Sequence, residues 1–102
     1  MATVLFVRAK SSLDPAELER RLIERRPRFL EVPGLVQKIY GRDESTGAVC
    51  GIYFFEDKKA LAEFRETELA KTIATAYEVT EMRLEAYEVL YPLYPERGPI
   101  PE

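Results

Sequence analysis

The chain has 102 residues and a formal net charge of −3, with 46% hydrophobic and 32% charged residues. This length and composition are typical of one folded domain and exclude general disorder. The acidic balance, with lysine and arginine spread along the chain, excludes the basic footprint of a nucleic-acid-binding protein. No apolar run approaches the roughly 20 residues that span a bilayer. We therefore expect a cytoplasmic protein with neither nucleic-acid nor membrane partners.

Several residue types are missing or rare. The chain has no histidine, which removes the most common general base, zinc ligand and proximal haem ligand, so we expect neither a metal site nor a cofactor. The single cysteine, Cys50, cannot form an internal disulfide. Asparagine and tryptophan are also absent and Gln37 is the only glutamine, a composition typical of thermophile proteins.

The first two elements are predicted as a strand and a helix. Alternating β-forming residues over 2–9 predict the strand. Asp14 is placed as a helix N-cap, Pro15 suits the first helical position, and Glu17 completes a capping-box pattern. An apolar stripe at helical spacing follows. Because Pro27 lies inside this stripe, we expect the helix to kink or restart there.

Two further strands are predicted to form a hairpin. The turn signal Pro33-Gly34 precedes a β-forming segment over 35–42. A polar loop over 43–47 then separates it from another β-forming segment over 48–55.

The remaining elements complete the predicted fold. Asp57 is placed to cap a second helix, Thr67 to restart it, and residues 81–90 predict the last strand. The order β-α-β-β-α-β predicts an α+β, ferredoxin-like domain over residues 1–91, with two helices on one face of a four-stranded antiparallel sheet. Residues 92–102 hold four of the seven prolines and predict an extended or disordered C-terminal tail.

The third predicted strand is apolar on both faces. Tyr53 and Phe55 point to one side, and Ile52 and Phe54 to the other. An uncovered apolar face normally marks an interface, and the simplest cover is the same face of a second copy. We therefore expect a homodimer. The alternative is that the strand is merely central and that residues of the tail shield it.

Three stretches carry a resemblance to a known family: Pro33-Gly34-Leu35, Lys38-Ile39-Tyr40 and Gly51-Ile52-Tyr53-Phe54-Phe55-Glu56-Asp57. They resemble the dimeric α/β-barrel superfamily, and most closely its YdhR-type mono-oxygenase branch, which is related to the antibiotic-biosynthesis mono-oxygenases. The likeness in layout covers most of residues 3–92. The resemblance implies a dimeric α/β barrel and cofactor-independent oxidation of aromatic or quinone-like molecules between sheet and helices.

Three positions depart from that branch. Glu66-Thr67-Glu68 stands where the branch tends to carry a histidine, Tyr40 where it often has a tryptophan, and Cys50 in place of a glycine. Haem-degrading members of the superfamily bind iron through histidine, so that activity is not expected here.

Tyr40 and Tyr53 are the candidate catalytic residues, because a tyrosine hydroxyl in an apolar pocket can donate to a substrate oxygen or pass a proton. The alternative is that both are sheet aromatics whose hydroxyls reach water. Arg8 and Lys38 are candidate substrate-binding cations that could neutralise a developing enolate or phenolate. They could instead lie at the sheet rim and extend into solvent.

Phe55 and Phe64 complete the candidate substrate-binding set. Cys50 is more readily explained as a small core thiol, and Glu68, Glu85 and Glu88 as solvated carboxylates. The resulting hypothesis is a cofactor-independent mono-oxygenase-like protein for a small aromatic or quinone-like molecule, with isomerisation and lactone chemistry as other reactions. The alternatives are a non-catalytic module that binds a small hydrophobic ligand and a purely structural dimer.

Overall fold

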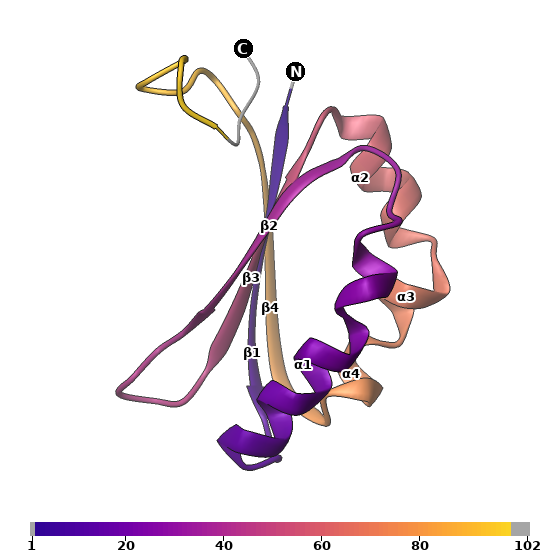
Figure 1. Ribbon diagram of the computed structural model, residues 1–102, viewed down its shortest axis with the longest axis vertical. Helices are drawn as coiled ribbons and strands as arrows, with labels where there is room; N and C mark the ends of the chain where they lie inside the picture. Colours follow the sequence, from indigo (N-terminus) through magenta and orange to yellow (C-terminus); the bar gives the residue numbers. More distant parts are fainter. Residues whose placement is uncertain (1, 99–102) are drawn as a thin grey trace.

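The computed structural model describes residues 2–98, which form a four-stranded antiparallel sheet with all helices on one side (Figure 1). The strand order is β2-β3-β1-β4, with β1 and β3 in the centre. The strands are β1 (Thr3–Ser11), β2 (Leu35–Arg42), β3 (Val49–Phe55) and β4 (Val79–Glu88). The helices are α1 (Pro15–Phe29), α2 (Lys58–Arg65), α3 (Glu68–Lys71) and α4 (Ile73–Ala76). The predicted ferredoxin-like α+β fold is confirmed.

The ends of the chain differ in part from the prediction. β4 begins at Val79, two residues earlier than expected. Residues 89–98 form no helix or strand, and in Figure 1 they lie on the side of the sheet opposite the helices. The rest of the predicted tail, 99–102, lies outside the described residues, and its separation from the domain stays a prediction. None of the described helices is long and apolar enough to cross a membrane.

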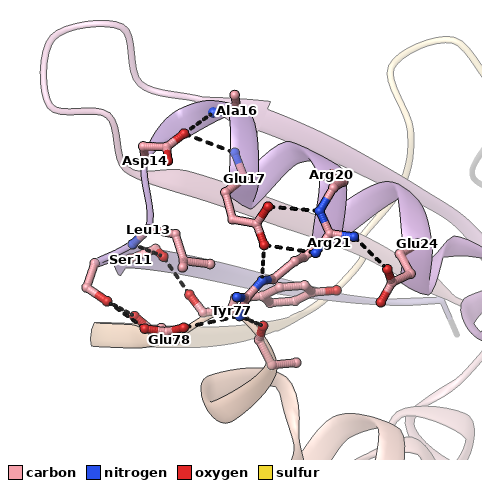
Figure 2. A network of polar contacts seen from close by, with 12 residues as sticks. Ser11, Leu13, Asp14, Ala16, Glu17, Arg20, Arg21, Glu24, Tyr77 and Glu78 are labelled. Atoms are coloured by element: carbon pink, nitrogen blue, oxygen red, sulfur yellow. Dashed lines mark hydrogen bonds and ion pairs between the residues drawn. The ribbon is translucent and has the colours of Figure 1, made fainter.

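The first turn of α1 is fixed by its N-cap. The Asp14 Oδ1 atom accepts hydrogen bonds from the backbone amides of Ala16 and Glu17 at 3.0 and 3.1 Å, as predicted. The carboxylate of Glu17 accepts instead from Arg20 and Arg21 (Figure 2). These hydrogen bonds lower the pKa of Glu17 to about 2, so only the Asp14 half of the expected capping box forms.

Of the kink or restart expected at Pro27, the restart does not occur. The helix continues through Pro27 to Phe29, and the amide of Leu30 still donates to the Arg26 carbonyl at 3.2 Å. Pro27 lies in the last turn of the helix, where its missing N–H removes a single hydrogen bond. The last turn of α1 lies next to the edge strand β2, where Phe29 contacts Lys38.

The core lies between the helices and one face of the sheet. Leu5, Tyr53 and Phe55 from the sheet pack with Phe29 of α1 and Phe64 of α2, and each is at most 4% exposed. Direct cross-strand partners share a face, so the pairs Leu5–Tyr53 and Thr3–Phe55 define the covered side.

The other face of the sheet is open, as the alternation in the sequence predicts. The pairs Val4–Phe54 and Phe6–Ile52 lie on it, and these side chains are only partly buried. Cys50, expected to be a small core thiol, lies instead half-buried on this open face, opposite Arg8. An apolar surface is therefore left without cover in the single chain.

Candidate active site

A cleft of about 550 Å³ lies between α1 and the edge of the sheet formed by β2 and β3. Leu22, Ile23 and Arg26 of α1 form one wall, and Lys38 and Tyr40 of β2 form the opposite wall. A smaller cleft of about 190 Å³ is also lined by Arg26, Lys38 and Tyr40. These three side chains therefore line both clefts.

A β-bulge at the start of β2 explains why Lys38 and Tyr40 face the helices. Leu35 pairs with Phe55, but the next paired residue of β2 is Gln37, which pairs with Phe54. The extra residue, Val36, shifts the alternation by one. As a result Lys38 lies opposite the buried Tyr53, whereas Ile39 faces the open side and is 45% exposed.

The amine of Lys38 is enclosed by aromatic rings. Its Nζ atom lies 3.5 Å from the ring centroid of Phe29, 4.3 Å from that of Tyr40 and 4.5 Å from that of Tyr53. Within residues 2–98 no carboxylate forms an ion pair with it. The amine is therefore held by ring faces alone.

Two effects act on the pKa of Lys38 in opposite directions. Burial disfavours the ammonium form and the Arg25 guanidinium repels it, and together they lower the pKa to about 7. Contact with the ring faces favours the ammonium by about 0.5–2 kcal/mol, which is smaller than the effect of burial. Near neutral pH the free amine of Lys38 is therefore much more populated than that of an ordinary lysine.

The tyrosine hydroxyls around this amine are held neutral. Burial is the main cause that raises the pKa values of Tyr40, Tyr53 and Tyr77. Tyr40 is 37% exposed and reaches the cleft, whereas Tyr53 is only 3% exposed and is stacked on Phe55 in the core. Tyr40 can therefore donate a hydrogen bond to a ligand in the cleft, and Tyr53 supports Lys38 through its ring.

The structure adds Arg25, Phe29 and Tyr77 to the surroundings of Lys38. The Arg25 Nη2 atom donates to the Leu69 carbonyl and to Thr72 Oγ1, both at 3.1 Å, and its guanidinium carbon lies 5.4 Å from the Tyr77 ring centroid. The sequence carried a signal for Arg25 and Phe29, because both fall on the same face of α1 as the buried residue Leu18. Tyr77 carried a similar signal, because it follows Leu69 and Ile73 at helical spacing.

The other predicted site residues lie elsewhere. Arg8 is on the open face, where its Nη2 atom is 3.4 Å from Asp43 Oδ2 and 3.4 Å from Thr46 Oγ1. Phe55 and Phe64 are buried in the core and line neither of the clefts at Lys38. Of the six predicted residues, the structure brings Lys38, Tyr40 and Tyr53 together. Phe55 and Phe64 pack behind them, and Arg8 is apart.

The comparisons with known proteins agree with this fold. The family model described as "Putative mono-oxygenase ydhR" matches residues 7–94. The chain belongs to the ydhR mono-oxygenase family. No curated protein sequence matches the chain.

Solved structures share the fold of this ydhR family member at low identity. SnoaB, a cofactor-independent oxygenase from Streptomyces nogalater, is 18% identical, with a TM-score of 0.75 over 90% of this chain and 96% of that chain. An antibiotic biosynthesis monooxygenase from Deinococcus radiodurans, described as putative, is 15% identical, with a TM-score of 0.73 over 92% and 97%. A protein from Nitrosomonas europaea with the same description is 16% identical, with a TM-score of 0.73 over 89% and 92%.

Metal ligands do not gather in the described part of the chain. Among residues 2–98, no group of three or more histidine, cysteine, aspartate or glutamate side chains is placed to hold a metal ion. The polar groups that face the cleft at Lys38 are a lysine, a tyrosine, two arginines and one glutamate. This set can bind, protonate and deprotonate an oxygen-bearing ligand.

Proposed function

We propose that the chain is a cofactor-independent mono-oxygenase that oxidises a small aromatic or quinone-like molecule in the cleft at Lys38. Membership of the ydhR mono-oxygenase family supports the reaction class. The name of SnoaB, a cofactor-independent oxygenase of the same fold, supports the absence of a cofactor. The observation that carries the proposal is the Lys38 amine, which opens on a cleft and is packed against three aromatic rings.

Each side chain has a distinct part in the proposed reaction. The free amine of Lys38 accepts a proton from the substrate hydroxyl or from an acidic ring carbon, and the resulting ammonium stays beside the substrate anion. Tyr40 donates a hydrogen bond to the anionic oxygen. Tyr53 acts as a positioning residue because its ring packs against Lys38. We therefore expect Tyr53→Phe to keep most of the activity.

The proposed reaction needs no external reductant. Oxygen chemistry is usually carried by a cofactor, so without one the substrate itself must supply the electrons. One atom of O₂ becomes the carbonyl oxygen on a ring CH₂ carbon, and the other leaves as water with the two hydrogens of that carbon. The carbon loses four electrons and O₂ gains four, so the reaction balances with substrate and O₂ alone.

Oxygen uptake with 1,8-dihydroxyanthrone tests this proposal, with the quinone product identified by mass spectrometry. We expect Lys38→Met to lower kcat by at least tenfold, because it removes the base but keeps an apolar side chain in the aromatic enclosure. Tyr40→Phe should lower kcat by about tenfold to a hundredfold, as expected for one lost hydrogen bond to a charged oxygen. Lys71→Met and Tyr94→Phe, at exposed positions away from the cleft, are the matched controls.

Three outcomes separate the hypotheses. Turnover that is lost in Lys38→Met but kept in Lys71→Met supports the mono-oxygenase. Binding of the anthrone without oxygen uptake favours the alternative of a non-catalytic binding module. If Lys38→Met turns over at the parent rate, the assignment of the site is wrong.

We also propose that the working unit is a homodimer in which the open faces of two sheets pack together. Phe6, Ile52 and Phe54 of the central strands, together with Ile39 at the edge, make this face apolar. A second copy would cover it through a self-complementary two-fold contact. The high exposure of Tyr91 and Leu93 in the described tail, 80% each, favours a second copy over the tail as the cover.

A further inference from the structure

The cations that line the cleft at Lys38 form no ion pairs among the described residues, in contrast to the arginines at the start of α1. On the first turns of α1, Arg20 and Arg21 lie 2.8 Å from carboxylate oxygens. Within residues 2–98, none of the three cleft cations has a carboxylate within ion-pair distance. These cations are Arg26, Lys38 and Arg42.

This excess of positive charge is local. The chain as a whole carries a net charge of −3, yet the two arginines in the cleft, with a partly protonated Lys38 beside them, face a single carboxylate, that of Glu19. A larger cleft of about 700 Å³ between α2 and β4 provides the contrast, because its charges balance. That cleft is lined by three bases, Lys58, Lys59 and Arg65, and by three acids, Asp57, Glu66 and Glu88.

Arg25 adds a further positive charge near Lys38. Its guanidinium carbon lies 5.4 Å from the Tyr77 ring centroid, and the guanidinium acts on its neighbours as a cation, since it lowers the pKa of Lys38 and opposes the effect of burial on the pKa of Tyr77. The electrostatic potential next to Lys38 is therefore positive.

From these observations we propose that the cleft takes an aromatic acid, with its ring against Leu22, Ile23 and Tyr40 and its carboxylate held by Arg26 and Arg42. The arginines lie at the exposed mouth of the cleft, and a guanidinium matches the geometry of a carboxylate. The inference rests on the proposed function for the aromatic part of the ligand. It adds a charged group that the oxidation chemistry does not require.

Fluorescence titration with two matched probes tests the inference. The probes are 3-hydroxy-2-naphthoate, which is an anion at pH 7, and 2-naphthol, which has the same ring system and is neutral. The chain has no tryptophan, so the naphthalene signal can be followed with little protein background. We expect the acid to bind at least tenfold more tightly than the naphthol at low ionic strength, and this preference to shrink as salt is added.

Single arginine substitutions locate the carboxylate. Arg26→Gln and Arg42→Gln should each weaken binding of the acid by about fivefold or more and change binding of the naphthol by less than twofold. The control is Arg65→Gln, which removes the same charge from the balanced cleft beside α2. Equal affinity for the two probes, or an affinity for the acid that neither substitution changes, would overturn the inference.

The carboxylate site and the oxygenase activity can fail independently of each other. Tight binding of the acid without oxygen uptake by any hydroxy-aromatic acid supports the charged site and contradicts the oxygenase. Turnover of neutral 1,8-dihydroxyanthrone with no preference for the acid supports the oxygenase and contradicts the charged site. If neither naphthalene binds, the aromatic-acid site is wrong.

Discussion

The ionisation of Lys38 links the stability of the protein to pH. Its ammonium would lie among Phe29, Tyr40 and Tyr53, with the guanidinium of Arg25 as a repelling neighbour. The folded pKa of about 7 is below the ordinary lysine value of 10.5. Between these two values the unfolded chain therefore binds a proton that the folded chain has released, so the free energy of unfolding rises with pH.

We predict that the free energy of unfolding increases by about 1–3 kcal/mol between pH 6.5 and 9.5, because the partial exposure of Lys38 reduces the full linkage value of about 1.4 kcal/mol per pKa unit. Urea unfolding at a series of pH values measures this increase. Lys38→Met should abolish most of the slope and be more stable than the parent at pH 6.5. The parallel control Lys71→Met should keep the slope, and a flat profile in the parent would contradict the lowered pKa of Lys38.

At the scale of elements, α1 forms one wall of the cleft, so its N-terminus influences the site. Asp14 caps this helix with two hydrogen bonds. Arg21 then ties the helix to the α4–β4 connection through the Ala76 carbonyl and the Glu78 carboxylate, both at 3.2 Å (Figure 2). The Asp14 cap and the contacts of Arg21 both fix the N-terminal half of α1.

We predict that Asp14→Ala lowers the free energy of unfolding by about 1–2 kcal/mol, because the amides of Ala16 and Glu17 lose their acceptor. Urea unfolding measures the total effect, and amide hydrogen exchange at these two residues measures the local one. Asp14→Asn is the matched control, since asparagine caps helices about as well and should restore most of the stability. Unchanged exchange in Asp14→Ala would show that the cap contributes nothing to the start of α1.

The order and type of the elements follow from the sequence, whereas one wall of the site does not. Caps, turns and apolar periodicity placed the strands and the two main helices because these signals are local. The bulge at Val36 is not a local signal: it arises from the pairing of β2 with β3. Strict alternation from Leu35 would send Ile39 toward the helices, and only the bulge sends Lys38 and Tyr40 there. Arg8 is a different case, because the regular alternation of β1 already places it with Val4 and Phe6 on the open face.

At the scale of the whole molecule, the open sheet face determines the proposed assembly. We predict that Phe6→Asp converts the homodimer to a monomer, because a carboxylate at the centre of the contact would be buried without a partner. Native mass spectrometry and light scattering measure the mass. Leu84→Asp is the control, since Leu84 is 53% exposed on the other face of the sheet.

A second substitution distinguishes dissociation of the dimer from unfolding of the chain. Ile39→Asp lies on the same open face at the edge strand, where the side chain is 45% exposed in the single chain. It should therefore dissociate the dimer while circular dichroism stays that of the parent. A parent protein that is monomeric at micromolar concentration, or folded dimers from both variants, would contradict the sheet-on-sheet arrangement.

The thiol of Cys50 lies where its reactivity can report on dissociation of the proposed dimer. It is the only cysteine in the chain, and it lies on the open face opposite Arg8. In the proposed dimer its sulfur is shielded by the second copy, whereas in a free monomer a maleimide can reach it. The rate of alkylation of one natural thiol would therefore follow subunit dissociation directly, and a fluorescent maleimide would label only those molecules that have separated.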